Sequence, residues 1–283
     1  MSSSMLSRLR QLAHHLYPTL RTSRMSTVHN TNDACCTIAP VKSDYVPKGK
    51  YKPYAGFSKV YVTGPETPGK VAIVCVYDIF GFKPQTQQGA DILAEKLKAQ
   101  VLMPDFFEPG EPWPVDQFPP KTPEEQKKLQ EFFGGIAKPT DGVARLINVA
   151  KTLKSEGVEF VGAYGFCWGG KVTILAGSQD ATPLDAVSAV HPAMLSHDDV
   201  TKLSIPLGLY PSNDEPVDEI KQILEIVSKK PISEKSDYKH YDSFHGFAAA
   251  RADLNDAENK KHYEDLYGRL CGYFSKVSGI PCE

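Results

Sequence analysis

The stretch of the sequence best suited to chemistry contains a cysteine with a glycine close by on each side. Residues 161–171 read V-G-A-Y-G-F-C-W-G-G-K, so Cys167 has a glycine two residues before it and another two residues after it. This G-x-C-x-G spacing is that of a nucleophile elbow with sulfur in place of the serine oxygen. The small neighbours fit a sharp turn between a strand and a helix. A helix that begins at Trp168 would point its positive end at the sulfur, which favours a thiolate.

Acidic and histidine side chains that would complete such a site follow Cys167 along the chain. Asp214 and His245 give the order nucleophile, acid, histidine that α/β-hydrolase triads have. We predict Asp214 as the acid that orients the histidine, with Glu215 and Asp242 as alternatives. Because Asp214 opens a predicted helix, it is also a candidate N-cap.

Several of these side chains are expected at one edge of one sheet, because they come directly after predicted strands. Asp78, Cys167, His191, Asp214 and His245 follow the predicted strands 71–77, 158–164, 185–190, 205–210 and 237–242. We prefer His245 as the general base because it lies in S-F-H-G-F, before the last predicted helix. His191, in H-P-A-M, reads as a structural or pocket-wall residue.

The elements that position these residues alternate between strand and helix. Further strands are expected at 57–63 and 100–105, and helices at 85–98, 123–133, 139–156, 168–178, 216–229 and 255–276. Residues 37–56 read as an extended lead-in, and residues 106–121 as a lid or loop. The alternation predicts one doubly wound, mostly parallel α/β sheet with helices on both faces, in a single domain over residues 33–283.

Composition excludes several classes of function. The chain has 283 residues, 41% of them hydrophobic, and a formal net charge of −2. Beyond residue 32 there are 28 basic and 34 acidic residues, so no basic face for a nucleic acid is expected. No apolar run approaches ~18 residues, so we expect no membrane span. The six cysteines show no zinc-ligand spacing, and we expect all six to be reduced thiols.

The first residues resemble a targeting segment. Residues 1–32 contain four arginines and no acid, with leucines on one helical face, as in a mitochondrial presequence. The alternative is a disordered tail. A second start at Met25 would give a cytoplasmic form, so we expect a mitochondrial location, a cytoplasmic one, or both.

Together the motifs resemble the dienelactone hydrolases. G-F-C-W-G-G, the D-I-F-G loop, N-D-E-P-V and H-G-F carry the resemblance over about residues 35–283, and C-C-T-I-A-P-V is typical of fungal members. The resemblance implies an α/β-hydrolase fold without a large cap domain. It also implies a triad of Cys167, His245 and Asp214, with oxyanion donors at the backbone N–H groups of Trp168 and Ile79.

Two positions depart from that family's pattern and bear on the substrate. Asp78 stands where members that open dienelactone usually have glutamate, and Arg251 is the cation that follows H-G-F. We expect both to take part in substrate binding, beside aromatic pocket residues Trp113, Phe118 and Trp168.

The sequence therefore predicts a thiol-dependent hydrolase of a lactone or small ester, working through an acyl-enzyme thioester. No metal or organic cofactor is needed, and a monomer or homodimer is expected. The alternatives are a broader carboxylesterase or thioesterase, or a non-catalytic redox or binding protein on the same scaffold.

Overall fold

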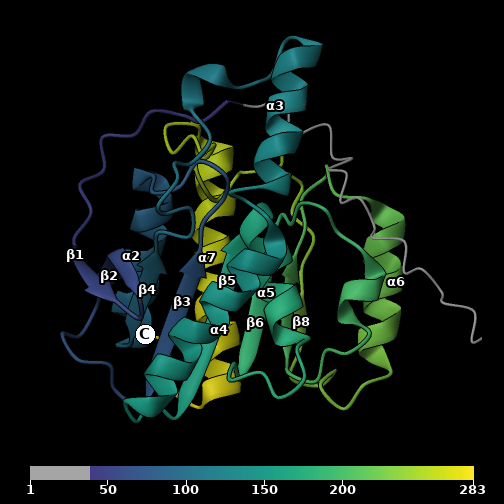
Figure 1. Cartoon of the computed structure of the whole chain (residues 1–283). Coiled ribbons are helices and arrows are strands. Elements are labelled where there is room, and N and C mark those ends of the chain that lie inside the picture. Colours follow the sequence, from purple (N-terminus) through teal and green to yellow (C-terminus); the bar gives the residue numbers. More distant parts are fainter. Residues whose placement is uncertain (1–38) are drawn as a thin grey trace, which may run out of the picture.

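Eight strands form one sheet in the computed structural model, which describes residues 39–283 (Figure 1). They are β1 (Lys50–Tyr54), β2 (Phe57–Thr63), β3 (Val71–Val76), β4 (Gln100–Pro104), β5 (Phe160–Phe166), β6 (Ala186–Val190), β7 (Leu207–Tyr210) and β8 (Asp237–Tyr238). Their spatial order is β1-β2-β4-β3-β5-β6-β7-β8. β1 and β2 pair antiparallel to each other, and β2 pairs antiparallel to β4. All pairs from β4 to β8 are parallel, so the predicted mostly parallel sheet is confirmed.

Helices cover both faces of this sheet. They are α2 (Pro84–Leu97), α3 (Pro123–Gly134), α4 (Pro139–Ser155), α5 (Trp168–Gly177), α6 (Val217–Ser228) and α7 (Ala257–Ser278), with 3-10 turns η2 (Val115–Gln117) and η3 (His197–Val200). In Figure 1, α4 and α5 lie in front of the sheet and α7 lies behind it. α3 stands above the sheet in the same view. Within residues 39–283 no large cap domain is found, only α3 and the loop before it.

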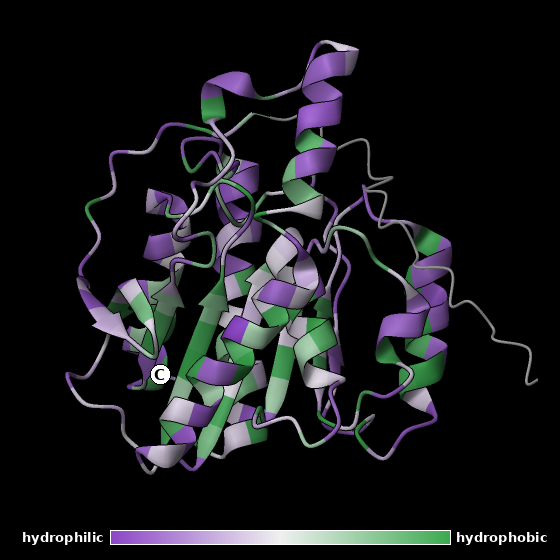
Figure 2. Cartoon of the chain, viewed as in Figure 1, coloured by the Kyte–Doolittle hydropathy of each residue, from purple (hydrophilic) through white to green (hydrophobic). Residues whose placement is uncertain are grey.

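The central strands are apolar along their whole length, because both of their faces are covered. Every residue of β3, β4 and β6 is buried. Figure 2 shows these strands as the hydrophobic centre of the molecule, with polar residues on the outer helices. This is why the continuous apolar run at 71–77 predicted its strand correctly.

The edge strand β1 was not predicted from the sequence. Because the residues of K-Y-K-P-Y are almost entirely exposed, this strand lacks the alternation of buried apolar and exposed polar residues that marks a strand in a sequence. β1 forms because it pairs with β2 through a tight turn at Ala55 and Gly56, whose φ angles are +50° and +85°. At the other edge β8 is shorter than the predicted strand 237–242.

One pair of cysteines contradicts the expectation of six reduced thiols. Cys271, in α7, forms a disulfide with Cys282 near the end of the chain. Cys75 and Cys167 are buried and lie outside this disulfide. The predicted targeting segment, residues 1–32, lies outside the described residues.

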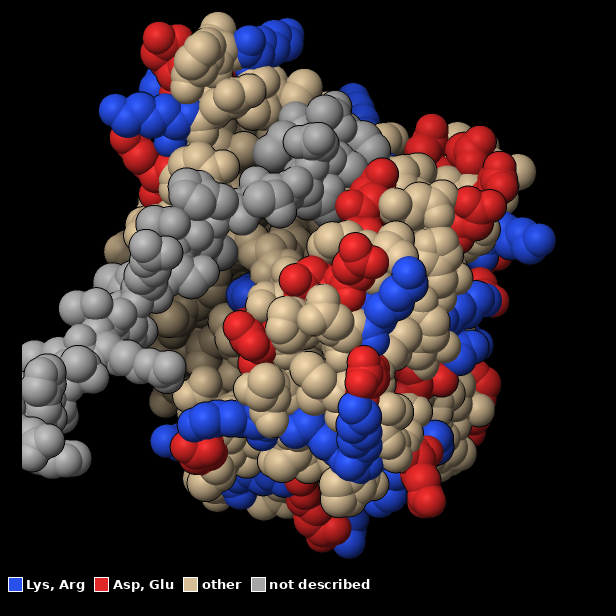
Figure 3. Space-filling view, turned by 90° about the vertical axis from the view of Figure 1, so that its right-hand side faces the viewer, with Lys and Arg blue, Asp and Glu red and all other residues tan. Residues whose placement is uncertain are grey.

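No helix in the described part is both long and apolar enough to cross a membrane. Figure 3 shows side chains of both charge signs intermixed on the face that it presents. That face therefore carries no continuous basic surface of the kind that binds a nucleic acid.

The packing of α2 on α7 supports the loop that contains His245. Tyr267 of α7 lies over Gly89 of α2, where an added Cβ would stand 1.8 Å from the tyrosine Cζ. The Tyr267 hydroxyl donates to the carbonyl oxygen of Ala248, three residues after His245 (3.1 Å). The missing side chain at Gly89 is thus what lets Tyr267 reach this loop.

We expect Gly89→Ala to lower the free energy of unfolding by about 1–3 kcal/mol, because the methyl group displaces the Tyr267 ring. Gly272→Ala is the matched control in α7, where an added Cβ meets nothing within 4 Å. It should raise stability by about 0.5–1 kcal/mol, the usual helix preference of alanine over glycine. Urea unfolding measures both changes, and stabilisation by Gly89→Ala would contradict this account of the packing.

Candidate active site

Cys167 occupies a strained turn between β5 and α5. Its φ and ψ angles are +53° and −115°, a conformation that residues with a side chain rarely adopt. The turn is possible because Gly165 and Gly169 have no Cβ. A Cβ at Gly169 would stand 2.2 Å from the Val76 carbonyl oxygen, and one at Gly165 would stand 2.1 Å from the Gly169 oxygen. The predicted sharp turn between a strand and a helix is therefore present, and the role of Cys167 as a nucleophile stays a prediction.

The backbone N–H and the backbone carbonyl oxygen of Cys167 both form hydrogen bonds. Its N–H donates to the carbonyl oxygen of Val190, the last residue of β6 (3.2 Å). Its own carbonyl oxygen accepts from the N–H groups of Ala193 (2.9 Å) and Gly170 (3.1 Å). The turn is thus fixed to the next strand and to the loop that follows it, and α5 begins at the next residue, Trp168.

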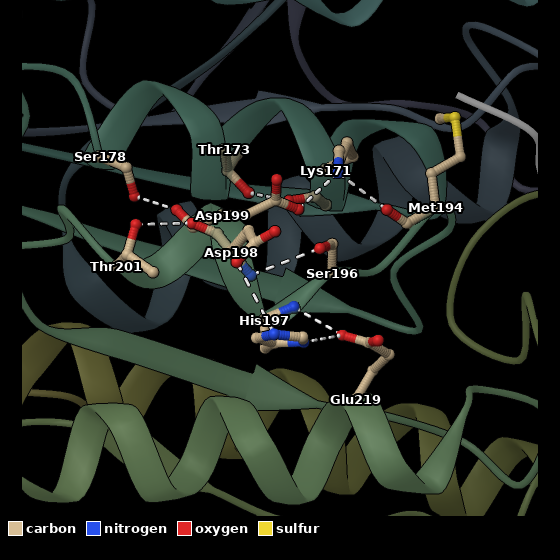
Figure 4. Close-up of polar contacts among 11 residues, drawn as sticks. Lys171, Thr173, Ser178, Met194, Ser196, His197, Asp198, Asp199, Thr201 and Glu219 are labelled. Atoms are coloured by element: carbon tan, nitrogen blue, oxygen red, sulfur yellow. Dashed lines mark hydrogen bonds and ion pairs between the residues drawn. The ribbon is translucent and has the colours of Figure 1, made fainter. Parts of the chain in front are cut away.

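Lys171 fastens the start of α5 to the same loop. Its ammonium group donates to the Met194 carbonyl oxygen (2.9 Å) and forms an ion pair with Asp199 of η3 (Figure 4). Both side chains are nearly buried. Burial raises the pKa of Asp199, and the charge of Lys171 opposes that rise. The ion pair holds the helix start, and with it the turn at Cys167, against the segment after β6.

His245 is oriented by Glu215. Nδ1 of His245 lies 2.6 Å from Oε1 of Glu215, and both side chains are fully buried. The other oxygen of Glu215 accepts from the N–H and the hydroxyl of Ser212, the latter at 2.9 Å. Because a carboxylate only accepts hydrogen bonds, it selects the tautomer with the proton on Nδ1. Nε2 is then the basic nitrogen of the imidazole.

The prediction that Asp214 orients the imidazole is wrong in this structure. Oδ2 of Asp214 instead accepts a hydrogen bond from the backbone N–H of His245 (2.6 Å). Glu215 is one methylene longer and reaches the ring. Asp242, the other alternative, accepts from the side-chain amide of Asn213 (2.7 Å) at the surface. Two consecutive carboxylates thus hold His245, one by its ring and one by its main chain.

Asp78 and Arg251 form a buried charged group near His245. The carboxylate of Asp78 accepts from the N–H groups of Phe80 (2.9 Å) and Ala250 (3.3 Å). Burial raises the pKa of Asp78, while Arg251, the two N–H groups and His245 oppose that rise. The structure thus brings these two residues together near His245, and their part in substrate binding stays a prediction.

The Arg251 guanidinium lies between two aromatic rings. Its Cζ is 5.1 Å from the Phe80 ring centroid and 5.0 Å from that of Phe118, and the residue is only 1% exposed. Such contacts stabilise a cation that has been taken out of water. Phe80 was not singled out from the sequence, although it lies in the same D-I-F-G loop as Asp78.

The predicted oxyanion donors lie in two different turns. Ile79 is held by its carbonyl oxygen, which accepts from the N–H of Trp113 (2.8 Å). The N–H of Trp168 is the first of α5, where the first four N–H groups have no partner within the helix. The indole of Trp168 donates to the Ala137 oxygen (2.6 Å) and packs on Phe107 and against Gly142 of α4, so this side chain belongs to the core.

Comparison with known proteins identifies the family of the chain. Residues 58–278 match the sequence model of the dienelactone hydrolase family. The chain belongs to this family. An uncharacterized AIM2 family protein of Schizosaccharomyces pombe is 33% identical over 252 residues, covering 86% of this chain and 99% of the relative. A carboxymethylenebutenolidase homolog of Xenopus tropicalis is 34% identical over 148 residues, covering 50% of this chain and 55% of the relative.

Solved structures show the same fold at low sequence identity. A dienelactone hydrolase-like promiscuous phosphotriesterase from metagenomic libraries superposes with a TM-score of 0.57 at 16% identity, covering 85% of this chain and 99% of the other. An α/β serine hydrolase without a lid from Xanthomonas campestris gives 0.53 at 13% identity, covering 85% and 100%. The chain is thus a dienelactone hydrolase family member with the α/β-hydrolase fold.

In this dienelactone hydrolase family member, Glu215→Gln should disturb the imidazole of His245 more than Asp214→Asn does. The two oxygens of Glu215 accept hydrogen bonds from Ser212 and from Nδ1–H of His245. A glutamine has only one such oxygen, so its NH2 group would face one of these donors. An asparagine at position 214 still has an oxygen that accepts from the main-chain N–H of His245. NMR of protein with isotope-labelled histidine should show the Nδ1–H signal of His245 lost or strongly shifted only in Glu215→Gln. The opposite pattern would restore Asp214 as the partner of the ring.

Proposed function

We propose that this protein is a thiol-dependent hydrolase of small esters or lactones, with Cys167 as nucleophile, His245 as general base and Glu215 as the orienting acid. The observation that carries the proposal is the strained Cys167 turn, at the sheet edge where Glu215 holds the imidazole of His245. Membership of the dienelactone hydrolase family supports a hydrolase. The two alternatives, a broader esterase or a non-catalytic thiol protein, become outcomes of the tests below.

Acylation begins when Nε2 of His245 takes the proton of the Cys167 thiol. The thiolate attacks the substrate carbonyl carbon, and the carbonyl oxygen becomes an oxyanion. The N–H groups of Trp168 and Ile79 are the proposed donors to that oxyanion, and one such donor typically contributes about 3 kcal/mol. The imidazolium then gives its proton to the leaving oxygen, which leaves a thioester on Cys167.

Deacylation uses the same groups in the reverse order. His245 takes a proton from a water molecule, whose oxygen attacks the thioester carbon. The carbon–sulfur bond breaks, and the proton returns to the Cys167 sulfur. Glu215 keeps its contact with Nδ1 throughout and stabilises the imidazolium that forms in both halves of the reaction.

Replacing the nucleophile tests this proposal. We expect Cys167→Ala to lower hydrolysis of para-nitrophenyl acetate by at least about 10³-fold, the scale seen when a nucleophile is removed. Cys167→Ser should also lose most activity, because a hydroxyl ionises far less readily than a thiol.

Cys75→Ala is the matched control, since Cys75 is the other buried cysteine of residues 39–283 that lies outside the disulfide. Its activity should stay close to wild type. Equal hydrolysis by wild type and Cys167→Ala would contradict the assignment of the nucleophile, and absence of hydrolysis in both would favour a redox or binding protein.

The charged group beside His245 supports an anionic substrate as part of the same proposal. Arg251 is a buried cation held between Phe80 and Phe118, and Asp78 is the carboxylate that opposes it. A bound carboxylate would gain a charge-assisted hydrogen bond from Arg251 in surroundings from which water is largely excluded. The substrate class proposed is therefore an ester or lactone that carries a carboxylate.

Arg251→Met should lower kcat/KM for a carboxylate-bearing aryl ester by at least about tenfold, the loss of one hydrogen bond to a charged group. The neutral aryl acetate should be affected much less, so the ratio of the two substrates is the measurement. Arg251→Lys keeps the positive charge and should recover part of the preference. An unchanged ratio in Arg251→Met would exclude Arg251 as the carboxylate-binding residue.

A further inference from the structure

His191 is a buried imidazole that the proposed mechanism leaves without a role. It follows β6 directly and is 0% exposed. Among residues 39–283, neither of its ring nitrogens has a hydrogen-bond partner. A buried polar group without a partner costs about 1–3 kcal/mol, so its presence calls for an explanation.

The surroundings of this ring are aromatic. Its centroid lies 5.5 Å from that of Phe166, 5.6 Å from that of Phe247 and 4.9 Å from that of the His245 imidazole. A phenylalanine would suit the two phenylalanine neighbours and would leave no polar atom unsatisfied. The packing alone therefore does not account for a histidine at this position.

The imidazole of His191 is neutral at neutral pH. Burial holds its pKa well below the ordinary range, and the nearby His245 and Arg251 lower it further. A neutral imidazole offers one N–H donor and one nitrogen acceptor. It can therefore bind a water molecule without taking a proton from it.

His191 and residues near it have strained backbone φ angles. The φ angle of His191 is +34°, and Cys167 and Met194 also have positive φ angles. Ala193, two residues after His191, donates its N–H to the Cys167 carbonyl oxygen (2.9 Å). Strain of this kind costs about 1–3 kcal/mol per residue and tends to be retained at functional sites. The loop after β6 thus connects the nucleophile turn to the ring beside His245.

We propose that His191 binds the water molecule that hydrolyses the acyl-enzyme, so that one water bridges a ring nitrogen of His191 and Nε2 of His245. The inference rests on the proposed function. The two rings lie edge to face with their centroids 4.9 Å apart, so the water lies beside the rings, where two hydrogen bonds of about 2.8 Å can join nitrogens up to about 5.6 Å apart. One O–H of the water donates to His191 and the other gives its proton to His245. The water oxygen bonds to the thioester carbon as the carbon–sulfur bond breaks, and the proton passes from His245 to the sulfur.

His191→Phe tests the proposal by separating the two halves of the reaction. With para-nitrophenyl acetate, the burst that reports acylation of Cys167 should stay close to wild type. The following steady rate should fall at least about tenfold, and acetylated Cys167 should accumulate in the mass spectrum of the intact protein. The melting temperature should equal or exceed that of wild type, because the unsatisfied imidazole is gone.

His191→Gln keeps an amide that hydrogen-bonds water and should recover part of the deacylation rate. If the phenylalanine variant does not fold, His191→Met takes its place beside His191→Gln. An equal fall in burst and steady rates, or no fall in either, would overturn the role of His191. A wild type that never forms an acyl adduct on Cys167 would instead overturn the proposed function itself, and the two failures are therefore distinguishable.

Discussion

The left-handed turn at Cys167 is the constraint on which the rest of the site depends. A residue with a side chain stays at φ +53° only when its surroundings hold it there. Here the end of β6 accepts its N–H, the loop after β6 donates to its carbonyl oxygen, and two glycines remove the side chains that would collide. Lys171 then ties the first turn of α5 to the same loop. Contacts of the main chain and a buried ion pair therefore fix the turn that carries the thiol.

Two neighbouring carboxylates hold His245 by contacting different groups of this residue. Glu215 contacts Nδ1, and Asp214 accepts from the main-chain N–H of the same residue. Ser212 donates twice to Glu215, so the carboxylate that faces the imidazole is itself fixed. This division follows from chain geometry, because successive side chains in a turn point in different directions and only the longer one reaches the ring. The result is an imidazole whose position and tautomer are determined by separate contacts.

Much of the fold could be predicted from the sequence, because buried parallel strands have unbroken apolar runs and the helices between them have a clear period. The elements missed or misjudged are those without that signal. β1 is exposed and forms only by pairing with β2. The Cys271–Cys282 disulfide joins a helix to the chain end, and spacing alone does not reveal that the two meet. At the candidate site, motif order indicated Cys167 and His245, but it could not separate Asp214 from Glu215 as the carboxylate beside the ring, since that choice depends on the direction of two adjacent side chains.

The charges at this edge of the sheet depend on one another because they share a buried setting. Asp78 and Glu215 are carboxylates, Arg251 is the cation between the two phenylalanine rings, and the imidazole of His191 is neutral. An imidazolium at His245 is stabilised by Glu215, whereas a second imidazolium at His191 would face it at a ring separation of 4.9 Å. Burial alone keeps His191 neutral, and the presence of His245 reinforces this. The same low polarity that makes an unpartnered imidazole costly thus disfavours a positive charge on both neighbouring histidines at once, as the proposed mechanism requires.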